Sequence, residues 1–309
     1  MLGFAAKRMG LACLVALAVS LIAFLLLRVS GDPAMAIAGE GASQADLDLI
    51  RRSYGFDRPI AVQYLDWLWR TVRGEFGESI YFKTPAGPLI LSKLQTTLML
   101  GLSSLLFALA ISVPLGVLAA LYKDSWIDRL CLALAVVGQA LPNFFFALLL
   151  IMVFSITLGV LPVSGSDTWQ HFVMPTIALG YYAAPAFMRL IRAGMIEVLE
   201  ADYIRTARAL GLPAWRVVFR HALRNAMVPV VALTAVQLGF LLGGSVVIES
   251  IFALDGLGYL AYQSITYKDF PVMQLIVLLL SLIYVVLTLL ADVANAWLDP
   301  RIRVSGGGQ

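Results

Sequence analysis

The residues with the clearest chemical potential lie in a short polar segment, from Arg189 to Arg224, between two long apolar stretches. This segment carries seven arginines and no lysine, and its centre reads Arg205-Thr-Ala-Arg-Ala-Leu-Gly211. A short basic loop between two membrane spans is retained in the cytoplasm. The pattern therefore indicates a cytoplasmic docking surface.

The segment predicts two short helices around a glycine turn. Residues from Met195 to Leu210 are strong helix formers, with acidic side chains first and arginines later, an order that suits the helix dipole. Gly211-Leu212-Pro213 breaks this helix, and a second begins at Ala214. On the second helix, one face is apolar and another is basic. The apolar face is Trp215, Val218, Phe219, Ala222 and Leu223, and the basic face is Arg216, Arg220 and Arg224.

Two small residues favour docking over a simpler role. Ala207 permits close approach of another surface, and Gly211 can adopt the positive φ of a helix terminus. Together they predict a protruding pair of helices whose turn is shaped to enter a partner's groove. The alternative is that the arginines only set the topology and touch anionic lipid headgroups.

Polar residues within the apolar stretches form a second set of candidates. Glu249 ends an apolar run at the external side and could face a translocation pathway or gate, with an interfacial position as the alternative. Asp292 is a weaker candidate of the same kind. Gln139, Asn143 and Gln237 could hydrogen-bond a peptide backbone, although bonding between helices is the commoner role of such residues.

The composition identifies the elements that must position these residues. Of 309 residues, 61% are hydrophobic and 13% are charged, and the mean hydropathy is +0.88. These values indicate a protein of the lipid bilayer without a large soluble catalytic domain. Six spans are predicted, over Met9–Val29, Thr96–Tyr122, Leu130–Leu158, Val173–Leu190, Val228–Ile248 and Val272–Trp297.

The charges around these spans predict the topology. Lys7 and Arg8 precede the first span and hold the N-terminus in the cytoplasm, and an even number of spans returns the C-terminus there, beside Arg301 and Arg303. Prolines in or beside the spans predict kinked or broken helices. The expected organisation is a first span (1–29), an external cap (30–95), a five-helix core (96–297) with the cytoplasmic loop 189–227, and a cytoplasmic tail (298–309).

Several motifs resemble one transporter family over nearly the whole chain. Asp202-Tyr-Ile-Arg-Thr-Ala-Arg-Ala-Leu-Gly-Leu212, followed by His221-Ala-Leu-Arg-Asn-Ala-Met-Val-Pro229, is similar to the EAA loop of the dipeptide, oligopeptide and nickel ABC-importer permeases. The general EAA pattern has Glu at Arg205 and Pro at Arg224, and both departures resemble the first-permease, or B-type, branch. Further similar segments are Tyr54–Pro59 with Gln63-Tyr64, Gly74–Ser79, Gly243–Glu249, Phe252–Gly258 and Leu298–Arg303.

The resemblance implies an all-α polytopic protein with six transmembrane helices, the type I ABC-importer permease fold and a cytoplasmic coupling-helix loop. It implies a bacterial inner-membrane location, a heterodimer with a second, C-type permease, two cytoplasmic ATPase subunits and an external substrate-binding protein. The loop would seat in a groove of an ATPase. The expected coupling residues are Asp202, Arg205, Thr206, Ala207, Gly211, Leu212, Arg216 and Arg220.

This subunit is expected to be non-catalytic. It has no Gly-Lys dipeptide and hence no P-loop, so ATP and Mg²⁺ are expected on the partner ATPases and no cofactor on this chain. Sparse histidine and cysteine favour no metal site, and no nucleic acid is expected.

Dipeptides or oligopeptides are the leading substrate class. Nickel chelates, glutathione or another small solute are the alternatives for an ABC importer. An ion-coupled secondary transporter, a membrane-embedded enzyme and a non-transporting scaffold remain as rival functions.

Overall fold

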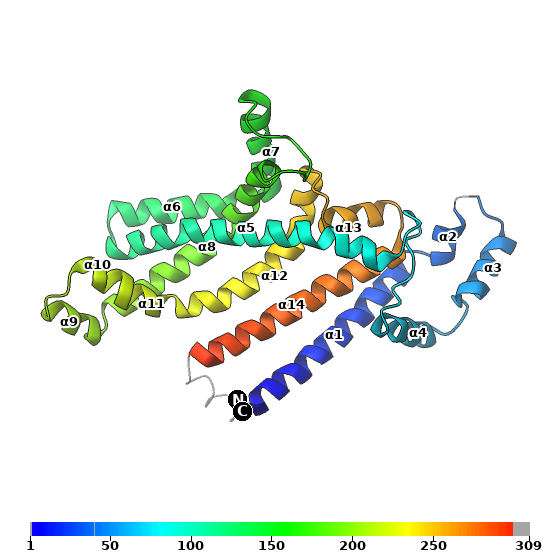
Figure 1. Ribbon diagram of the computed structural model, residues 1–309, viewed down its shortest axis with the longest axis horizontal. Coiled ribbons are helices and arrows are strands. Elements are labelled where there is room, and N and C mark those ends of the chain that lie inside the picture. Colours follow the sequence, from blue (N-terminus) through cyan, green and yellow to red (C-terminus); the bar gives the residue numbers. More distant parts are fainter. Residues whose placement is uncertain (1, 40, 299–309) are drawn as a thin grey trace.

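The computed structural model describes residues 2–39 and 41–298, which form an elongated bundle of helices (Figure 1). In this part of the chain the strand content is limited to one isolated bridge, between Glu78 and Pro85. The predicted tail, with the motif Leu298–Arg303, extends beyond the described residues from position 299. The elements are α1 (Leu2–Ser30), α2 (Pro33–Ala38), α3 (Gln44–Tyr54), α4 (Ile60–Val72), α5 (Ala86–Leu121), α6 (Trp126–Ala140), α7 (Asn143–Leu150), η1 (Ile151–Thr157), α8 (Gln170–Leu199), α9 (Asp202–Ala209), α10 (Ala214–Arg216), η2 (Val217–Ala222), α11 (Leu223–Ala226), α12 (Val228–Ile251), α13 (Leu257–Thr266) and α14 (Phe270–Leu298).

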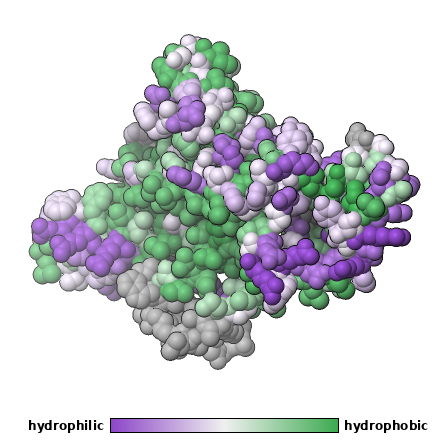
Figure 2. All heavy atoms as spheres, turned by 45° about the vertical axis from the view of Figure 1, so that its right-hand side comes forward, coloured by the Kyte–Doolittle hydropathy of each residue, from purple (hydrophilic) through white to green (hydrophobic). Residues whose placement is uncertain are grey.

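Four helices are long and apolar enough to cross a membrane: α1, α5, α12 and α14. They run along the length of the bundle (Figure 1), and Figure 2 shows a broad hydrophobic region between two hydrophilic ends. The fourth predicted span lies in α8, whose arginines and other polar residues keep it out of this set. The all-α membrane fold is therefore as predicted, whereas the number of six spans is not established by length and composition.

The third predicted span, Leu130–Leu158, is broken at Pro142, one of the prolines that predicted kinked or broken helices. Its two halves, α6 and the α7–η1 pair, meet at an angle of 97°, and α7 projects away from the bundle in Figure 1. Leu141 is extended, with φ −83° and ψ 123°, and Pro142 follows it. Proline lacks an N–H group and disfavours helical backbone at the preceding residue, which explains the break.

The second predicted span begins earlier than the apolar pattern indicates. Helix α5 starts at Ala86, within the predicted cap, and has 36 residues. At 1.5 Å per residue it is about 54 Å long, well beyond the roughly 30 Å of hydrocarbon. Pro114 in α5, and Pro175 and Pro185 in α8, lie inside helices that continue through them. Of the predicted proline breaks, the one at Pro142 is the clearest.

The centre of the bundle is the contact between α5 and α8. A side-chain carbon on Gly180 would lie 2.5 Å from the carbonyl oxygen of Ser104, and one on Gly116 would lie 2.9 Å from Ile191. These glycines allow the two backbones to approach closely, as small residues do in membrane helix pairs. Around them, buried side chains of α5, α8, η2 and α12 form the main core.

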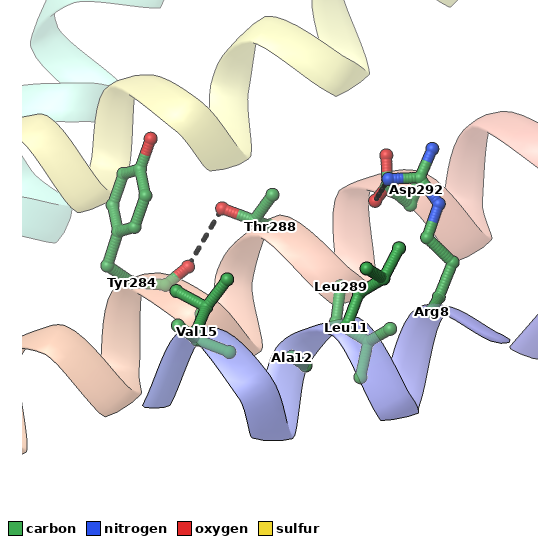
Figure 3. A pocket seen from close by; sticks show the side chains of 9 residues that line it. Arg8, Leu11, Ala12, Val15, Tyr284, Thr288, Leu289 and Asp292 are labelled. Atoms are coloured by element: carbon green, nitrogen blue, oxygen red, sulfur yellow. Dashed lines mark hydrogen bonds and ion pairs between the residues drawn. The ribbon is translucent and has the colours of Figure 1, made fainter. Parts of the chain in front are cut away.

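Helix α1 packs along α14 at the edge of the bundle (Figure 3). Their contact is apolar along most of its length and ends in an ion pair of 2.7 Å between Arg8 and Asp292. Asp292, a weaker pathway candidate, therefore binds the first helix instead. The pair also places the start of α1 and the end of α14 at the same end of the molecule.

The predicted external cap is a set of short helices attached to α1. Phe24 of α1 is buried against Tyr64 and Trp67 of α4, with ring centroids 5.6 and 5.8 Å apart. The hydroxyl groups of Ser20 and Tyr64 lie 2.8 Å apart. Aromatic packing of this kind stabilises contacts beyond simple burial. The outer end of α1 thus supports α4 and the segment that follows it.

Candidate functional site

The predicted docking loop projects from one end of the bundle, at the left of Figure 1, as α9, α10, η2 and α11. Its first helix was predicted to run without interruption from Met195 to Leu210. Instead α8 ends at Leu199 and α9 begins at Asp202, because Ala201 is extended with φ −69° and ψ 147°. We call residues 202–226 the knuckle.

The turn of the knuckle is built on Gly211. Its φ is +75°, the left-handed value that glycine adopts at little steric cost. Its N–H group donates to the carbonyl oxygen of Arg208 at 3.0 Å, and the N–H group of Leu212 donates to that of Ala207 at 3.3 Å. A side-chain carbon at Gly211 would meet no atom within 4 Å. The position therefore restricts backbone conformation and not side-chain size.

The buried and exposed faces of the knuckle differ from the prediction. Ala207 is only 8% exposed and packs inward, where its small size allows close contact within the chain. Trp215 and Phe219, assigned to the apolar face, are 61% and 59% exposed, whereas Val218 and Ala222 of the same face are buried, as is Val217. The cause is η2, a π-helical turn that shifts the helical register.

The exposed face of the knuckle combines arginines with apolar side chains. Leu210 is 76% exposed and lies beside the Gly211 turn. The guanidinium group of Arg216 lies 5.4 Å from the centre of the Trp215 ring, within cation–π distance. Of the other predicted coupling residues, Leu212 is half-buried and the rest are exposed: Asp202, Arg205, Thr206 and Arg220.

Two of these residues contact each other only weakly. Arg205 and Asp202 approach to 3.5 Å with highly exposed side chains, a pair that contributes little to stability. The Thr206 hydroxyl donates to the carbonyl oxygen of Asp202 at 3.0 Å. The Arg205 guanidinium group thus stays accessible to other molecules.

A buried ion pair at the base of the knuckle was not predicted from the sequence. Arg192 of α8 donates two hydrogen bonds to Asp128 at the start of α6, at 2.7 and 2.6 Å. The Asp128 side chain is 3% exposed and also accepts the N–H group of Asp124 at 3.0 Å. Two parallel bonds of this kind fix both position and orientation. The pair joins α6 to the part of α8 that leads into the knuckle.

Replacing Asp128 with Ala should lower the free energy of unfolding by about 2 kcal/mol, because the partly buried Arg192 would lose both of its hydrogen bonds to the carboxylate. Reversible denaturation of the purified chain in mixed micelles measures this change. Glu200→Ala is the matched control, since its pair with Lys123 at 3.2 Å is exposed and worth less than about 1 kcal/mol. Equal losses in the two variants would contradict a structural role for the buried pair.

Glu249, a candidate for facing the pathway or gate with an interfacial position as the alternative, is enclosed within the subunit. Its carboxyl group accepts hydrogen bonds from the hydroxyls of Ser245 and Thr97, at 2.7 and 2.9 Å. It also accepts the backbone N–H groups of Gly258 and Tyr259, at 2.7 and 3.1 Å. These N–H groups belong to the first turn of α13, which lacks helical partners for them. Glu249 therefore connects α5, α12 and α13.

The other three pathway candidates lie on separate elements. Gln139, on α6, accepts a hydrogen bond from Arg189 of α8 at 2.9 Å. Asn143 is the first residue of α7, directly after the break, and Gln237 is half-buried in α12. Helix α7 contacts both α8 and α12, so these residues lie around one group of helices. The structure does not join them with Glu249 into a single polar cluster.

Comparison with known proteins gives consistent matches over nearly the whole chain. Residues 112–304 match the family described as "Binding-protein-dependent transport system inner membrane component", and residues 1–101 match the N-terminal region of such membrane components. The glutathione transport system permease protein GsiC of Escherichia coli K12 is 40% identical over 92% of this chain and 94% of that protein. GsiC of Salmonella typhimurium LT2 is 40% identical over 98% and 99%.

Solved structures show the same fold at lower identity. The MetNI methionine ABC transporter, in inward-facing conformations, is similar with a TM-score of 0.58 and 21% identity. The similarity covers 68% of this chain and 96% of that chain. A second crystal form gives a TM-score of 0.55 at 22% identity.

Proposed function

Because this chain belongs to the family of binding-protein-dependent transport system inner membrane components and is the permease subunit of a bacterial ABC importer, we propose that it imports short peptides, glutathione among them. The support is the 40% identity to glutathione permeases and the resemblance of the EAA loop to peptide permeases. Glutathione is itself a tripeptide, so one pathway for short peptides accommodates both. Nickel chelates are the competing cargo.

The chain is a non-catalytic, multi-pass inner-membrane subunit that works with ATPase and substrate-binding partners. We propose that it pairs with a second, C-type permease and that the ATPases bind ATP and Mg²⁺. We further propose that the knuckle and both termini lie in the cytoplasm. The Arg8–Asp292 pair supports this topology, because it holds the start of α1 to the end of α14.

The observation that carries the coupling mechanism is the exposed apolar surface of the knuckle. Leu210, Trp215 and Phe219 are exposed at the end of the bundle, next to accessible arginines. Exposed aromatic side chains beside arginines are the usual composition of strong binding surfaces. An ATPase groove with an apolar floor and acidic rim would cover them.

Closure of the ATPases on ATP would then move the knuckle, and the knuckle would move the membrane helices. Helix α8 runs 30 residues from the far loop to the base of the knuckle. The Asp128–Arg192 pair attaches α6 to the same base. A displacement of the knuckle is therefore expected to shift α8 and α6 together and to alternate access to the pathway.

The test of coupling is Gly211→Pro, because proline cannot adopt a φ of +75°. We expect ATP-dependent uptake and substrate-stimulated ATP hydrolysis to fall together, by at least about tenfold if the distorted turn costs 1.4 kcal/mol or more of docking. Gly211→Asn is the control, since asparagine tolerates the left-handed region and nothing blocks its side chain. Normal uptake by correctly inserted Gly211→Pro protein would refute the coupling role.

A further inference from the structure

A second candidate site lies at the end of the bundle opposite the knuckle. A cavity of about 540 Å³ is enclosed by the outer end of α1, by α3 and α4, by the loop before α5 and by the start of α14. These elements meet at the right of Figure 1, where Figure 2 shows many hydrophilic residues. The volume falls within the range of about 300–1,000 Å³ that is usual for small-molecule sites.

The cavity wall contains a cation without an acidic partner. The guanidinium group of Arg28 lies between the rings of Phe24 and Phe56, 5.0 and 4.7 Å from their centres. Asp32 is the acidic residue whose charge acts on Arg28, but Asp32 is bonded to Arg51 at 2.6 Å. Within residues 2–39 and 41–298, Arg28 forms no ion pair. A half-buried guanidinium group held in this way is suited to bind a carboxylate.

Two amides on the cavity wall have buried atoms without hydrogen-bond partners: Oε1 of Gln63 and Nε2 of Gln274. The orientation of Gln63 is fixed, because its Nε2 donates to the carbonyl oxygens of Phe56 and Arg58 at 3.0 and 2.8 Å. Leaving buried polar atoms unbonded costs free energy, so native proteins rarely do so without a ligand or water. Here an acceptor and a donor remain, which is the complement of a peptide group.

The rest of the wall carries both signs of charge. The loop before α5 contributes Glu75, Glu78 and Lys83, and α4 contributes Arg70. Arg58, which also lines the cavity, is paired with Asp66 at 3.1 Å. The two glutamates of this loop can attract an ammonium group, while Arg28 attracts a carboxylate. A zwitterionic ligand therefore fits this wall better than a simple anion or cation does.

We propose that this cavity is an external binding site for a short peptide, with the C-terminal carboxylate on Arg28. One peptide group donates its N–H to Gln63 and accepts from Gln274 through its carbonyl oxygen. The N-terminal ammonium group faces Glu75 and Glu78. The site would hold cargo before it enters the helices, and this inference rests on the proposed import of peptides.

The test is equilibrium binding of labelled trialanine to the complete permease–ATPase complex in lipid nanodiscs, without the binding protein. Arg28→Met should raise the dissociation constant at least tenfold, and Arg28→Lys, which keeps the charge, should raise it only a few-fold. Arg73→Met is the matched control: Arg73 also lies over an aromatic ring, 4.5 Å from the centre of Trp69, but does not line the cavity. It should change binding less than twofold.

A second variant and a second probe make the assignment specific. Gln274→Leu should also weaken trialanine binding, and trialanine amide, which lacks the carboxylate, should bind the unmodified complex at least tenfold more weakly. Arg28→Met should abolish the difference between acid and amide. Persistence of that difference in Arg28→Met protein would overturn the proposal.

Uptake measured in parallel separates the two proposals. If the unmodified transporter imports trialanine but Arg28→Met leaves trialanine binding unchanged, the cavity site is refuted and peptide import still stands. If the unmodified transporter neither imports nor binds trialanine and glutathione, the proposed function is refuted, and the cavity assignment with it.

Discussion

Replacing Trp215 with Ala should detach the ATPase subunits from the membrane complex and abolish most ATP-dependent uptake. Trp215 is 61% exposed on the knuckle and is stacked with Arg216. Truncation of a tryptophan at the centre of an interface typically costs about 2–4 kcal/mol, which corresponds to a roughly 30- to 700-fold loss of affinity. Retention of the ATPases on immobilised permease measures the first effect, and uptake into vesicles measures the second.

Trp169→Ala is the matched control for this variant. Trp169 is similarly exposed but precedes α8 at its other end, away from the knuckle. It should retain the ATPases and transport normally. If Trp215→Ala also retained them, the exposed apolar surface of the knuckle would not be the contact surface, and the coupling proposal would lose its main support.

The largest loss of stability is expected from Glu249→Ala. The change leaves the Thr97 hydroxyl and the N–H groups of Gly258 and Tyr259 without their acceptor, whereas the Ser245 hydroxyl keeps the carbonyl oxygen of Leu242. Each unpaired buried donor costs about 1–3 kcal/mol, so a total of about 3–5 kcal/mol is expected after partial rearrangement. Such a loss would leave little correctly folded protein. Thermal unfolding in detergent and the yield of monodisperse protein measure it.

Two further variants separate this structural role from a role in the pathway. Glu249→Gln keeps the shape and one acceptor oxygen, so it should lose less stability than Glu249→Ala. Asp255→Ala removes a nearby carboxylate whose pair with Lys93 is more exposed, and it should lose less than about 1 kcal/mol. A stable Glu249→Ala protein with defective transport would contradict the structural role and restore a pathway role.

Much of the fold was accessible from the sequence because it depends on local patterns. Apolar runs located the long helices, and the Gly211-Leu212-Pro213 sequence located the turn of the knuckle, where Gly211 has the expected positive φ. The prolines of the spans predicted kinked or broken helices, and Pro142 lies at such a break, but the local pattern did not distinguish it from Pro114, Pro175 and Pro185, where the helices continue. The apolar pattern reports burial in lipid or protein and does not report the direction of a helix after a break.

The contacts that specify the sites depend on distant residues and could not be read from local pattern. Asp128 and Arg192 are 64 positions apart, and Thr97 and Glu249 are 152 apart. The exposure of Trp215 and Phe219 depends on the π-helical turn η2, whereas the prediction assumed regular α-helical spacing. For Glu249, the closely following Gly256 and Gly258 were a usable signal, because glycines allow a backbone to approach a buried carboxylate.

The central claim is that this chain is the permease of an ATP-driven importer of short peptides. Its most direct test is uptake of labelled trialanine and glutathione into vesicles that contain the complete transporter and its binding protein, with the proton gradient collapsed. We predict that the labelled peptides accumulate only when ATP is present on the side of the membrane that carries the ATPase subunits. Accumulation that continues without ATP but stops when ion gradients are removed would contradict the claim and identify a secondary transporter.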